Sequence, residues 1–106
     1  IMTEKPGIYI IAGPNGAGKT TLANIVLPRF LHVTDFVNAD TIARGLAAFD
    51  PGKVALQAGR LMLKRLEELK DQRATFAFES TLASRTFVPY LKDAQRRGYY
   101  VRLYYV

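Results

Sequence analysis

Apolar positions along the chain fall into short continuous runs that alternate with segments of helical character. Residues 8–12 form a nearly continuous apolar run followed by a glycine, which is typical of a strand buried on both faces of a parallel sheet. Further short runs predict strands at residues 36–38, 75–78 and 99–106. The segments between them predict helices at residues 20–27, 41–46, 53–70 and 85–97. This alternation predicts an α/β fold with a mostly parallel sheet, flanking helices and right-handed crossovers.

Residues that favour turns and caps predict where the helices begin and end. Pro28 is expected to end the first helix, and residues 50–52 are expected to form a turn before the third. Asp40 and Ser84 are expected to cap the second and fourth helices, and Gly98 to end the fourth. The residues expected to face the core are Val54, Ala58, Leu61, Met62, Leu66 and Leu69 in the third helix and Phe87, Val88, Leu91 and Ala94 in the fourth.

The first predicted strand leads into the glycine-rich loop Gly13-Pro14-Asn15-Gly16-Ala17-Gly18-Lys19-Thr20. This is the Walker A pattern in its usual place between a strand and a helix. Glycines let successive backbone N–H groups point at an anion, and the helix adds unpaired N–H groups and the positive end of its dipole. In this motif the lysine, here Lys19, reaches the β- and γ-phosphates, and the hydroxyl of Thr20 binds Mg²⁺. The loop, with Thr21 directly after it, therefore predicts binding of ATP with Mg²⁺.

The same loop also resembles that of transporter-type ATPases, in which it lies well inside a domain. Only twelve residues precede the loop here, and the chain has no Leu-Ser-Gly-Gly-Gln segment and no apolar strand that ends in Asp-Glu. These differences argue against such an ATPase.

Composition narrows the kinds of site that the chain can hold. Its 106 residues are enough for one domain. The chain has no cysteine and one histidine, His32, which excludes disulfides, thiolate sites, histidine metal clusters and Ser-His-Asp triads. His32 itself is expected to be an ordinary loop or core residue. The lack of cysteine fits a reducing cytoplasm, and no apolar run reaches the roughly eighteen residues of a membrane span.

The net charge of +6 suits a polyanionic ligand, either a nucleotide or a nucleic acid. Basic residues are spread along the chain, and their one local cluster, Lys92 with Arg96 and Arg97, is typical of a solvated helix face. Aromatic residues do not interleave with it, and no recognition element is evident. Nucleic acid is therefore not the expected partner.

Polar residues follow the second and third predicted strands, where ligands bind in parallel α/β sheets. Asp40 is a candidate general base beside an acceptor hydroxyl, although it could instead cap a helix and pair with Arg44. Glu79 could hold the water shell of Mg²⁺ or contact the acceptor. The alternative is a solvent-exposed carboxylate at the end of the strand. Thr81 could hydrogen-bond the acceptor or stabilise a turn. Arg44 and Arg85 could contact phosphate or form surface ion pairs.

Four segments taken together resemble the zeta toxin family of P-loop kinases. They are the glycine-rich loop and residues 36–43 (Phe-Val-Asn-Ala-Asp-Thr-Ile-Ala), 58–63 and 78–82 (Phe-Glu-Ser-Thr-Leu), in the family's order and spacing. The resemblance implies a nucleoside-monophosphate-kinase-like fold in which the strand ending at Glu79 lies beside the P-loop strand. It also implies an antitoxin protein as a possible partner.

The activity that this resemblance implies is transfer of the γ-phosphate of ATP to a sugar nucleotide. In the best-known members the acceptor is UDP-N-acetylglucosamine. On this match Asp40 is the catalytic base, and Lys19 and Thr20 are the Walker residues. Glu79 and Thr81 match contacts to the acceptor.

The chain departs from the family pattern at three places. Asn38 stands where the toxins commonly carry the first aspartate of an Asp-x-Asp pair. Ala83 stands where they commonly carry an arginine, and Arg85 follows two residues later. Family members also continue past a strand like residues 99–106 into a lid whose arginines neutralise the transferring phosphate. We therefore expect residues 1–106 to be the N-terminal portion of a longer P-loop kinase domain, and to bind nucleotide but turn over poorly.

Two other functions stay open at this stage. One is a kinase of nucleic-acid ends or of another metabolite, which the basic charge favours slightly. The other is a nucleotide-binding fragment that does not transfer phosphate.

Overall fold

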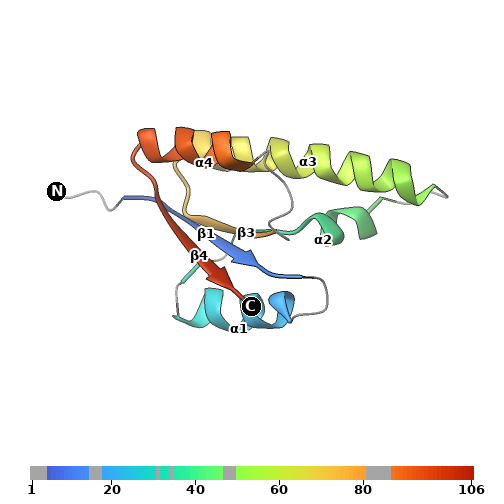
Figure 1. Ribbon diagram of the computed structural model, residues 1–106, viewed down its shortest axis with the longest axis horizontal. Helices are drawn as coiled ribbons and strands as arrows, with labels where there is room; N and C mark the ends of the chain where they lie inside the picture. The colour runs from blue at the N-terminus through green and yellow to red at the C-terminus, as the bar shows by residue number, and fades with distance from the viewer. Residues whose placement is uncertain (1–4, 15–17, 31, 34, 47–49, 81–86) are drawn as a thin grey trace.

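The computed structural model describes residues 5–14, 18–30, 32–33, 35–46, 50–80 and 87–106. Within this part of the chain, strands and helices follow one another in the order that the sequence predicts (Figure 1). The strands are β1 (Gly7–Ala12), β2 (Phe36–Val37), β3 (Phe76–Ser80) and β4 (Tyr100–Tyr105). The helices are α1 (Lys19–Phe30), α2 (Ala39–Arg44), α3 (Pro51–Asp71) and α4 (Phe87–Arg96). None of these helices has both the length and the apolar character that a membrane crossing requires.

The sheet built by these strands has the order β2-β3-β1-β4, and each neighbouring pair is parallel. The predicted α/β fold with a parallel sheet is therefore confirmed. In register, Ile11 of β1 lies opposite Glu79 of β3 on one side and opposite Tyr104 of β4 on the other. The strand that ends near Glu79 is thus adjacent to the strand that leads into the glycine-rich loop, as the resemblance implied. Because the pairs are parallel, the carboxyl ends of the strands share one edge of the sheet.

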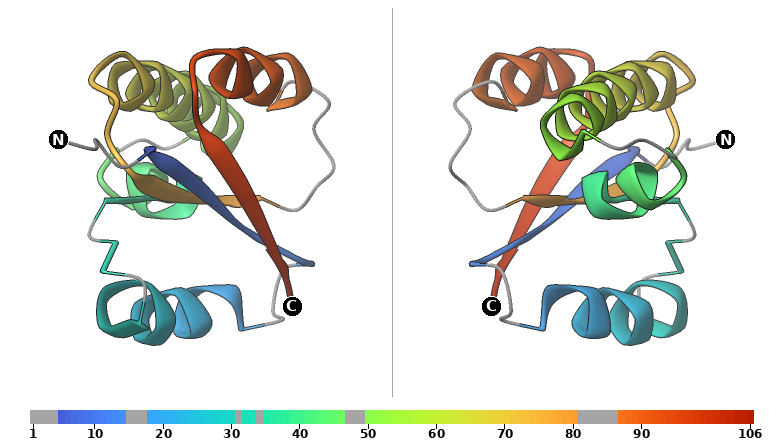
Figure 2. Two further views of the ribbon diagram at one scale, coloured as in Figure 1. Left: turned by 90° about the vertical axis from the view of Figure 1, so that its left-hand side faces the viewer. Right: turned by 90° about the vertical axis from the view of Figure 1, so that its right-hand side faces the viewer.

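Helices α3 and α4 cover one face of the sheet, and α1 covers the other (Figures 1 and 2). Alternate residues of a strand point to opposite faces. Ile8 and Ile10 of β1 accordingly pack with α3 and α4, whereas Tyr9 and Ile11 pack on the side of α1. Every residue of β1 is buried, which confirms the strand predicted to be covered on both faces. Full burial of an aliphatic side chain stabilises a folded protein by roughly 1.5–3 kcal/mol, so the buried residues of β1 hold the start of the following loop in place.

The inward faces of α3 and α4 differ in two places from the predicted ones. Leu61 was predicted to face the core but is 44% exposed, and Val88 is 50% exposed. A helix turns by about 100° per residue, so each of these residues lies about a quarter-turn away from the side that is buried. On α4 that side includes Tyr90, which the sequence pattern missed and whose hydroxyl donates to the carbonyl oxygen of Leu66 at 2.6 Å. The residues of α3 that are buried are Ala58, Met62, Leu66, Leu69 and Lys70.

Helix α1 continues through Pro28 to Phe30, so the predicted end at Pro28 is wrong. A proline in the last turn, on the exposed side, removes one backbone donor and leaves the earlier turns intact. The buried side chains of Leu27 and Val33 hold this segment against the sheet. The N–H of Val33 donates to the carbonyl oxygen of Leu27 at 2.9 Å, after His32 has adopted a positive φ of 55°.

The starts of α2 and α3 also differ from their predicted positions. Asn38, and not Asp40, caps α2, because its side chain accepts a hydrogen bond from the N–H of Asp40. Residues 50–52 are the start of α3 rather than a separate turn, since the side chain of Asp50 accepts from two N–H groups of the first turn. Gly98 follows α4 with a φ of 96°, as expected for a residue that ends a helix. Ser84, predicted to cap α4, lies outside the described residues.

Candidate functional site

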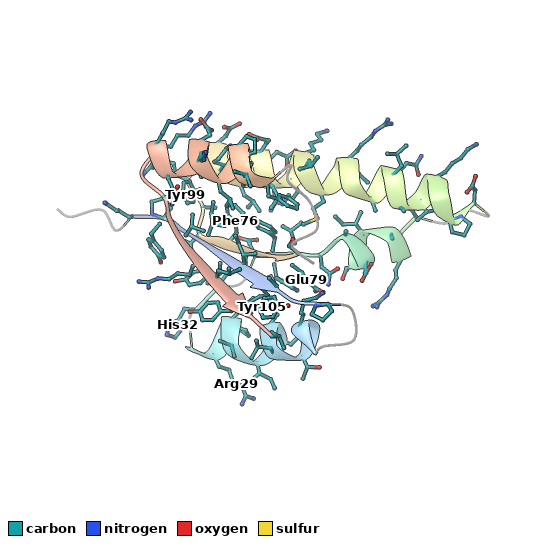
Figure 3. All side chains as sticks on the ribbon, viewed as in Figure 1. Arg29, His32, Phe76, Glu79, Tyr99 and Tyr105 are labelled. Carbon is teal, nitrogen blue, oxygen red and sulfur yellow. The ribbon has the colours of Figure 1, made fainter. Side chains whose placement is uncertain are left out.

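The carboxyl ends of the parallel strands β1, β2 and β3 share one edge of the sheet, where Glu79 of β3 (labelled in Figure 3) lies beside Lys19 in the first turn of α1. Gly13 follows β1, Asn38 follows β2, and Glu79 lies near the end of β3. Lys19 is the first residue of α1. Parallel sheets bind ligands beyond the carboxyl ends of their strands, so this edge is where a ligand of this fold is expected.

The described ends of the glycine-rich loop adopt backbone conformations that favour glycine. Gly13 has a φ of 146° and Gly18 a φ of 85°, where a side chain would be strained. A Cβ on Gly13 would also lie 2.7 Å from the carbonyl oxygen of Val106, so the chain approaches the loop too closely for any other residue. The N–H of Leu22 donates to the carbonyl oxygen of Gly18 at 3.0 Å. The backbone conformations at Gly13, directly after β1, and at Gly18, directly before α1, are therefore both ones that glycine adopts readily.

The remaining loop residues are only partly described. Pro14, Gly18 and Thr21 are exposed. Asn15, Gly16 and Ala17 lie outside the described residues, and so does the side chain of Thr20. Their predicted contacts with phosphate and Mg²⁺ stay predictions.

Lys19 places a buried positive charge beside the start of the loop. Its side chain is 3% exposed, its Nζ donates to the carbonyl oxygen of Gly13 at 2.5 Å, and the same Nζ lies 3.6 Å from Oε1 of Glu79. A buried ammonium group is costly unless it has hydrogen-bond acceptors and a nearby opposite charge, and Gly13 and Glu79 supply both. The structure thus brings together the predicted phosphate-binding lysine and the predicted metal-side carboxylate.

Asn38 connects the end of β2 with Glu79 on β3 and with the first turn of α2. It is 8% exposed, and its Nδ2 donates to Oε2 of Glu79 at 2.7 Å across 41 positions of sequence. Its Oδ1 accepts from the N–H of Asp40 at 2.8 Å. The sequence predicted Asn38 to lie at the end of the second strand and to face the phosphate loop, and marked it as a departure from a family motif, without assigning it a role. The signal that was available is its residue type, because an amide at a strand end can donate and accept at once.

Asp40 and Arg44 lie on α2 and are both exposed. Asp40 is in the first turn, next to Asn38 and at the same edge of the sheet as Glu79. The alternative in which Asp40 pairs with Arg44 is wrong for these side chains, since no ion pair joins them in the described part of the chain. Thr81 and Arg85 lie outside the described residues. His32 is exposed after α1, which agrees with its prediction as an ordinary loop residue.

The donor set at this edge fits Mg²⁺ bound together with a nucleotide. In the residues that the structure describes, no group of three or more His, Asp and Glu side chains could hold a metal ion by itself. Mg²⁺ at nucleotide sites does not need such a group, because phosphate oxygens and waters supply most of its ligands beside one or two carboxylates. Glu79 supplies one carboxylate here, 3.6 Å from the Nζ of Lys19.

Comparison with known proteins shows a similarity to a solved structure. No protein-family model and no curated protein sequence matches the chain. Among solved structures, it is similar to a candidate kinase from Chloroflexus aurantiacus J-10-fl, with a TM-score of 0.77 and 16% sequence identity. The similarity covers 98% of this chain and 60% of that protein's chain. The chain therefore has the fold of this protein and spans 60% of its length.

Proposed function

We propose that this chain is the ATP-binding part of a small-molecule kinase of zeta-toxin type. It would transfer the γ-phosphate of ATP to a hydroxyl of an acceptor for which UDP-N-acetylglucosamine is the leading candidate. The observation that carries the proposal is the meeting of Lys19, Glu79 and Asn38 beside a glycine-rich loop that opens a helix. The fold shared with a candidate kinase agrees with it.

Each described residue of the site has a role in this proposal. The backbone of the loop and the first turn of α1 bind the phosphates, and Lys19 neutralises charge on the β- and γ-phosphates. Mg²⁺, held with the nucleotide by Thr20 and Glu79, supplies further neutralisation of the same charge. Asp40 lies at the acceptor side, exposed in the first turn of α2, where it accepts the proton of the attacking hydroxyl. Thr81 and an antitoxin belong to the proposal through the family resemblance, and Arg44 belongs to it as a candidate contact to phosphate.

Mass spectrometry of UDP-N-acetylglucosamine after incubation with the chain, Mg²⁺ and ATP tests the proposal. We expect the unaltered chain to add one phosphate to the sugar nucleotide slowly, in keeping with the poor turnover predicted from its sequence, and Asp40→Asn to add none at equal ATP affinity. The matched control is Asp71→Asn, the same change at an exposed aspartate in the last turn of α3. Product formation that survives Asp40→Asn contradicts the role of Asp40. ATP binding without any phosphorylated sugar contradicts the proposed acceptor.

A kinase of nucleic-acid ends is the second candidate, because the net charge is +6. It predicts that short oligonucleotides become phosphorylated and that their binding weakens steeply as salt is raised. Phosphorylation of the oligonucleotide but not of the sugar nucleotide would favour this candidate over the first.

A further inference from the structure

Both ends of the Asn38 side chain are engaged, and they reach different parts of the site. Nδ2 donates to Oε2 of Glu79 on β3, and Oδ1 accepts from the N–H that begins α2. The backbone of Asn38 is extended, with φ −137° and ψ 121°, as is usual for a residue that caps a helix. One buried side chain therefore ties the end of β2 to the end of β3 and to the first turn of α2.

The chemistry of the neighbours determines which way the amide points. A backbone N–H can only donate, so the atom facing Asp40 is the amide oxygen. A carboxylate can only accept, so the atom facing Glu79 is the amide nitrogen. Serine at this position could still cap the helix but would be too short to reach Glu79. Aspartate could also cap the helix, but it would place a second negative oxygen where Nδ2 now lies, 2.7 Å from Oε2 of Glu79.

We propose that Asn38 is a positioning residue of the phosphoryl-transfer site. By holding Oε2 of Glu79, it orients the carboxylate so that Oε1 faces the Nζ of Lys19 at 3.6 Å. By capping α2, it sets the place of Asp40 relative to the same carboxylate. Asn38 thus couples the acceptor side of the site to the phosphate side. This inference rests on the function proposed above.

The neutrality of Asn38 is part of this role. With an amide at this position, Glu79 is the carboxylate near Lys19, and the pair adds no net charge to a site built to receive phosphates. A second carboxylate beside Glu79 would add one negative charge and would repel both Glu79 and the phosphates. An amide therefore orients Glu79 without weakening the attraction of Lys19 for an anion.

Three altered proteins separate positioning from mere packing. Asn38→Ser keeps the cap and removes the bond to Glu79. Asn38→Asp keeps the cap and replaces the donor by a carboxylate. Asn38→Asp combined with Glu79→Gln restores a hydrogen bond between the two strand ends, but the charge then lies on β2 instead of β3. Asn24→Asp, the same chemical change at an exposed position of α1, is the matched control.

We expect Asn38→Ser and Asn38→Asp to lower kcat for phosphate transfer at least tenfold. Asn38→Asp should also weaken binding of Mg²⁺–ATP, measured by calorimetry. Asn38→Asp should also lower the midpoint of thermal unfolding. Adding Glu79→Gln to it should restore this midpoint, but should restore neither kcat nor the affinity for Mg²⁺–ATP. Asn24→Asp should leave all three quantities unchanged.

Recovery of kcat and affinity together with stability in the exchanged protein would overturn the proposal, because the bond would then serve packing alone. Wild-type kcat and affinity in Asn38→Asp would overturn it as well. If the unaltered chain transfers no phosphate, the proposed function fails. The positioning role is then still tested by the combined variant, in which the midpoint of thermal unfolding should recover and the affinity for Mg²⁺–ATP should not.

Discussion

Lys19 and Lys70 are the two lysines buried in the part of the chain that the structure describes, with exposed fractions of 4% and 3%. Lys70 lies where α3 meets α4, and its Nζ is 2.9 Å from Oδ2 of Asp93 and 3.3 Å from Oε1 of Glu67. The same ammonium group lies 4.0 Å from the centroid of the Tyr90 ring. Lys19 has a single carboxylate neighbour in the described residues, at the longer distance of 3.6 Å, and one carbonyl acceptor.

This difference shows that burial of a lysine does not by itself identify a functional site. The charge of Lys70 is balanced by two carboxylates and an aromatic face, so its interactions hold two helices together. Lys19 instead lies in the first turn of α1, where the helix dipole is already positive and a further positive charge is unfavourable. A lysine held at the positive end of a helix dipole is expected where the site binds an anion such as the phosphates of ATP.

The largest expected difference between the two lysines is in nucleotide binding. Under the proposed function, Lys19→Ala would remove charge-assisted hydrogen bonds to two phosphates, each worth roughly 1.5–3 kcal/mol, so affinity for Mg²⁺–ATP should fall about 10²- to 10⁴-fold. Lys70→Ala should leave this affinity unchanged, because Lys70 lies between α3 and α4 and not at the strand ends. Calorimetric titration of both variants makes the comparison. Equal losses of affinity would contradict the expectation that Lys19 binds the nucleotide and Lys70 does not.

The next effect is on stability, and it should run in the opposite direction. Lys70→Met keeps the buried stem and removes the charge that Asp93 and Glu67 share, so the free energy of unfolding should fall by about 1–2 kcal/mol. Lys19→Met removes the partner of Glu79, which destabilises, and also a cation at the positive end of the helix dipole, which stabilises, so stability should change by less than about 1 kcal/mol in either direction. Urea unfolding measures both values. A larger loss for Lys19→Met would reverse the comparison.

The smallest effect concerns acid pH. The hydrogen bond from Lys70 lowers the pKa of the Asp93 carboxyl, and the charges of Lys70 and Arg97 lower it further. Because the folded-state pKa is below the unfolded value of about 4, this contribution to stability is present above pH 4. It is lost as the pH falls below 4 through the folded-state pKa. Between about pH 6 and pH 2, the midpoint of thermal unfolding should fall less in Asp93→Asn than in the unaltered protein. Identical pH profiles would show that the Lys70 contact does not stabilise the fold.

Much of the fold could be predicted because its signals are local. The run at residues 8–12 and the glycines after it predicted β1 and the start of the loop from adjacent residues alone. The errors arose where a choice depended on packing. Pro28 was expected to end α1, but Leu27 and Val33 are buried on either side of it and keep that segment in place. Leu61 fits the helical spacing of an inward face, yet it lies about a quarter-turn away from the side of α3 on which Ala58 and Met62 are buried.

In the candidate site, too, some features could be predicted from local sequence and others depended on packing. Lys19 and its glycine-rich loop could be recognised from eight consecutive residues. Asp40 and Glu79 could be placed near the same edge because each follows a predicted strand. The cap of α2 was assigned to Asp40 instead of Asn38, since both residue types cap helices and the sequence offers no way to choose between them.

By itself, the sequence determined the order of strands and helices and the phosphate-binding loop, because both depend on side-chain spacing and backbone freedom over a few residues. Only the tertiary structure decided which polar groups meet. The bond between Asn38 and Glu79 spans 41 positions and exists because β2 lies beside β3. The approach of Lys19 to Glu79 exists because β3 also lies beside β1. Strand order follows from how the whole sheet packs between its helices, and no local pattern carries that information.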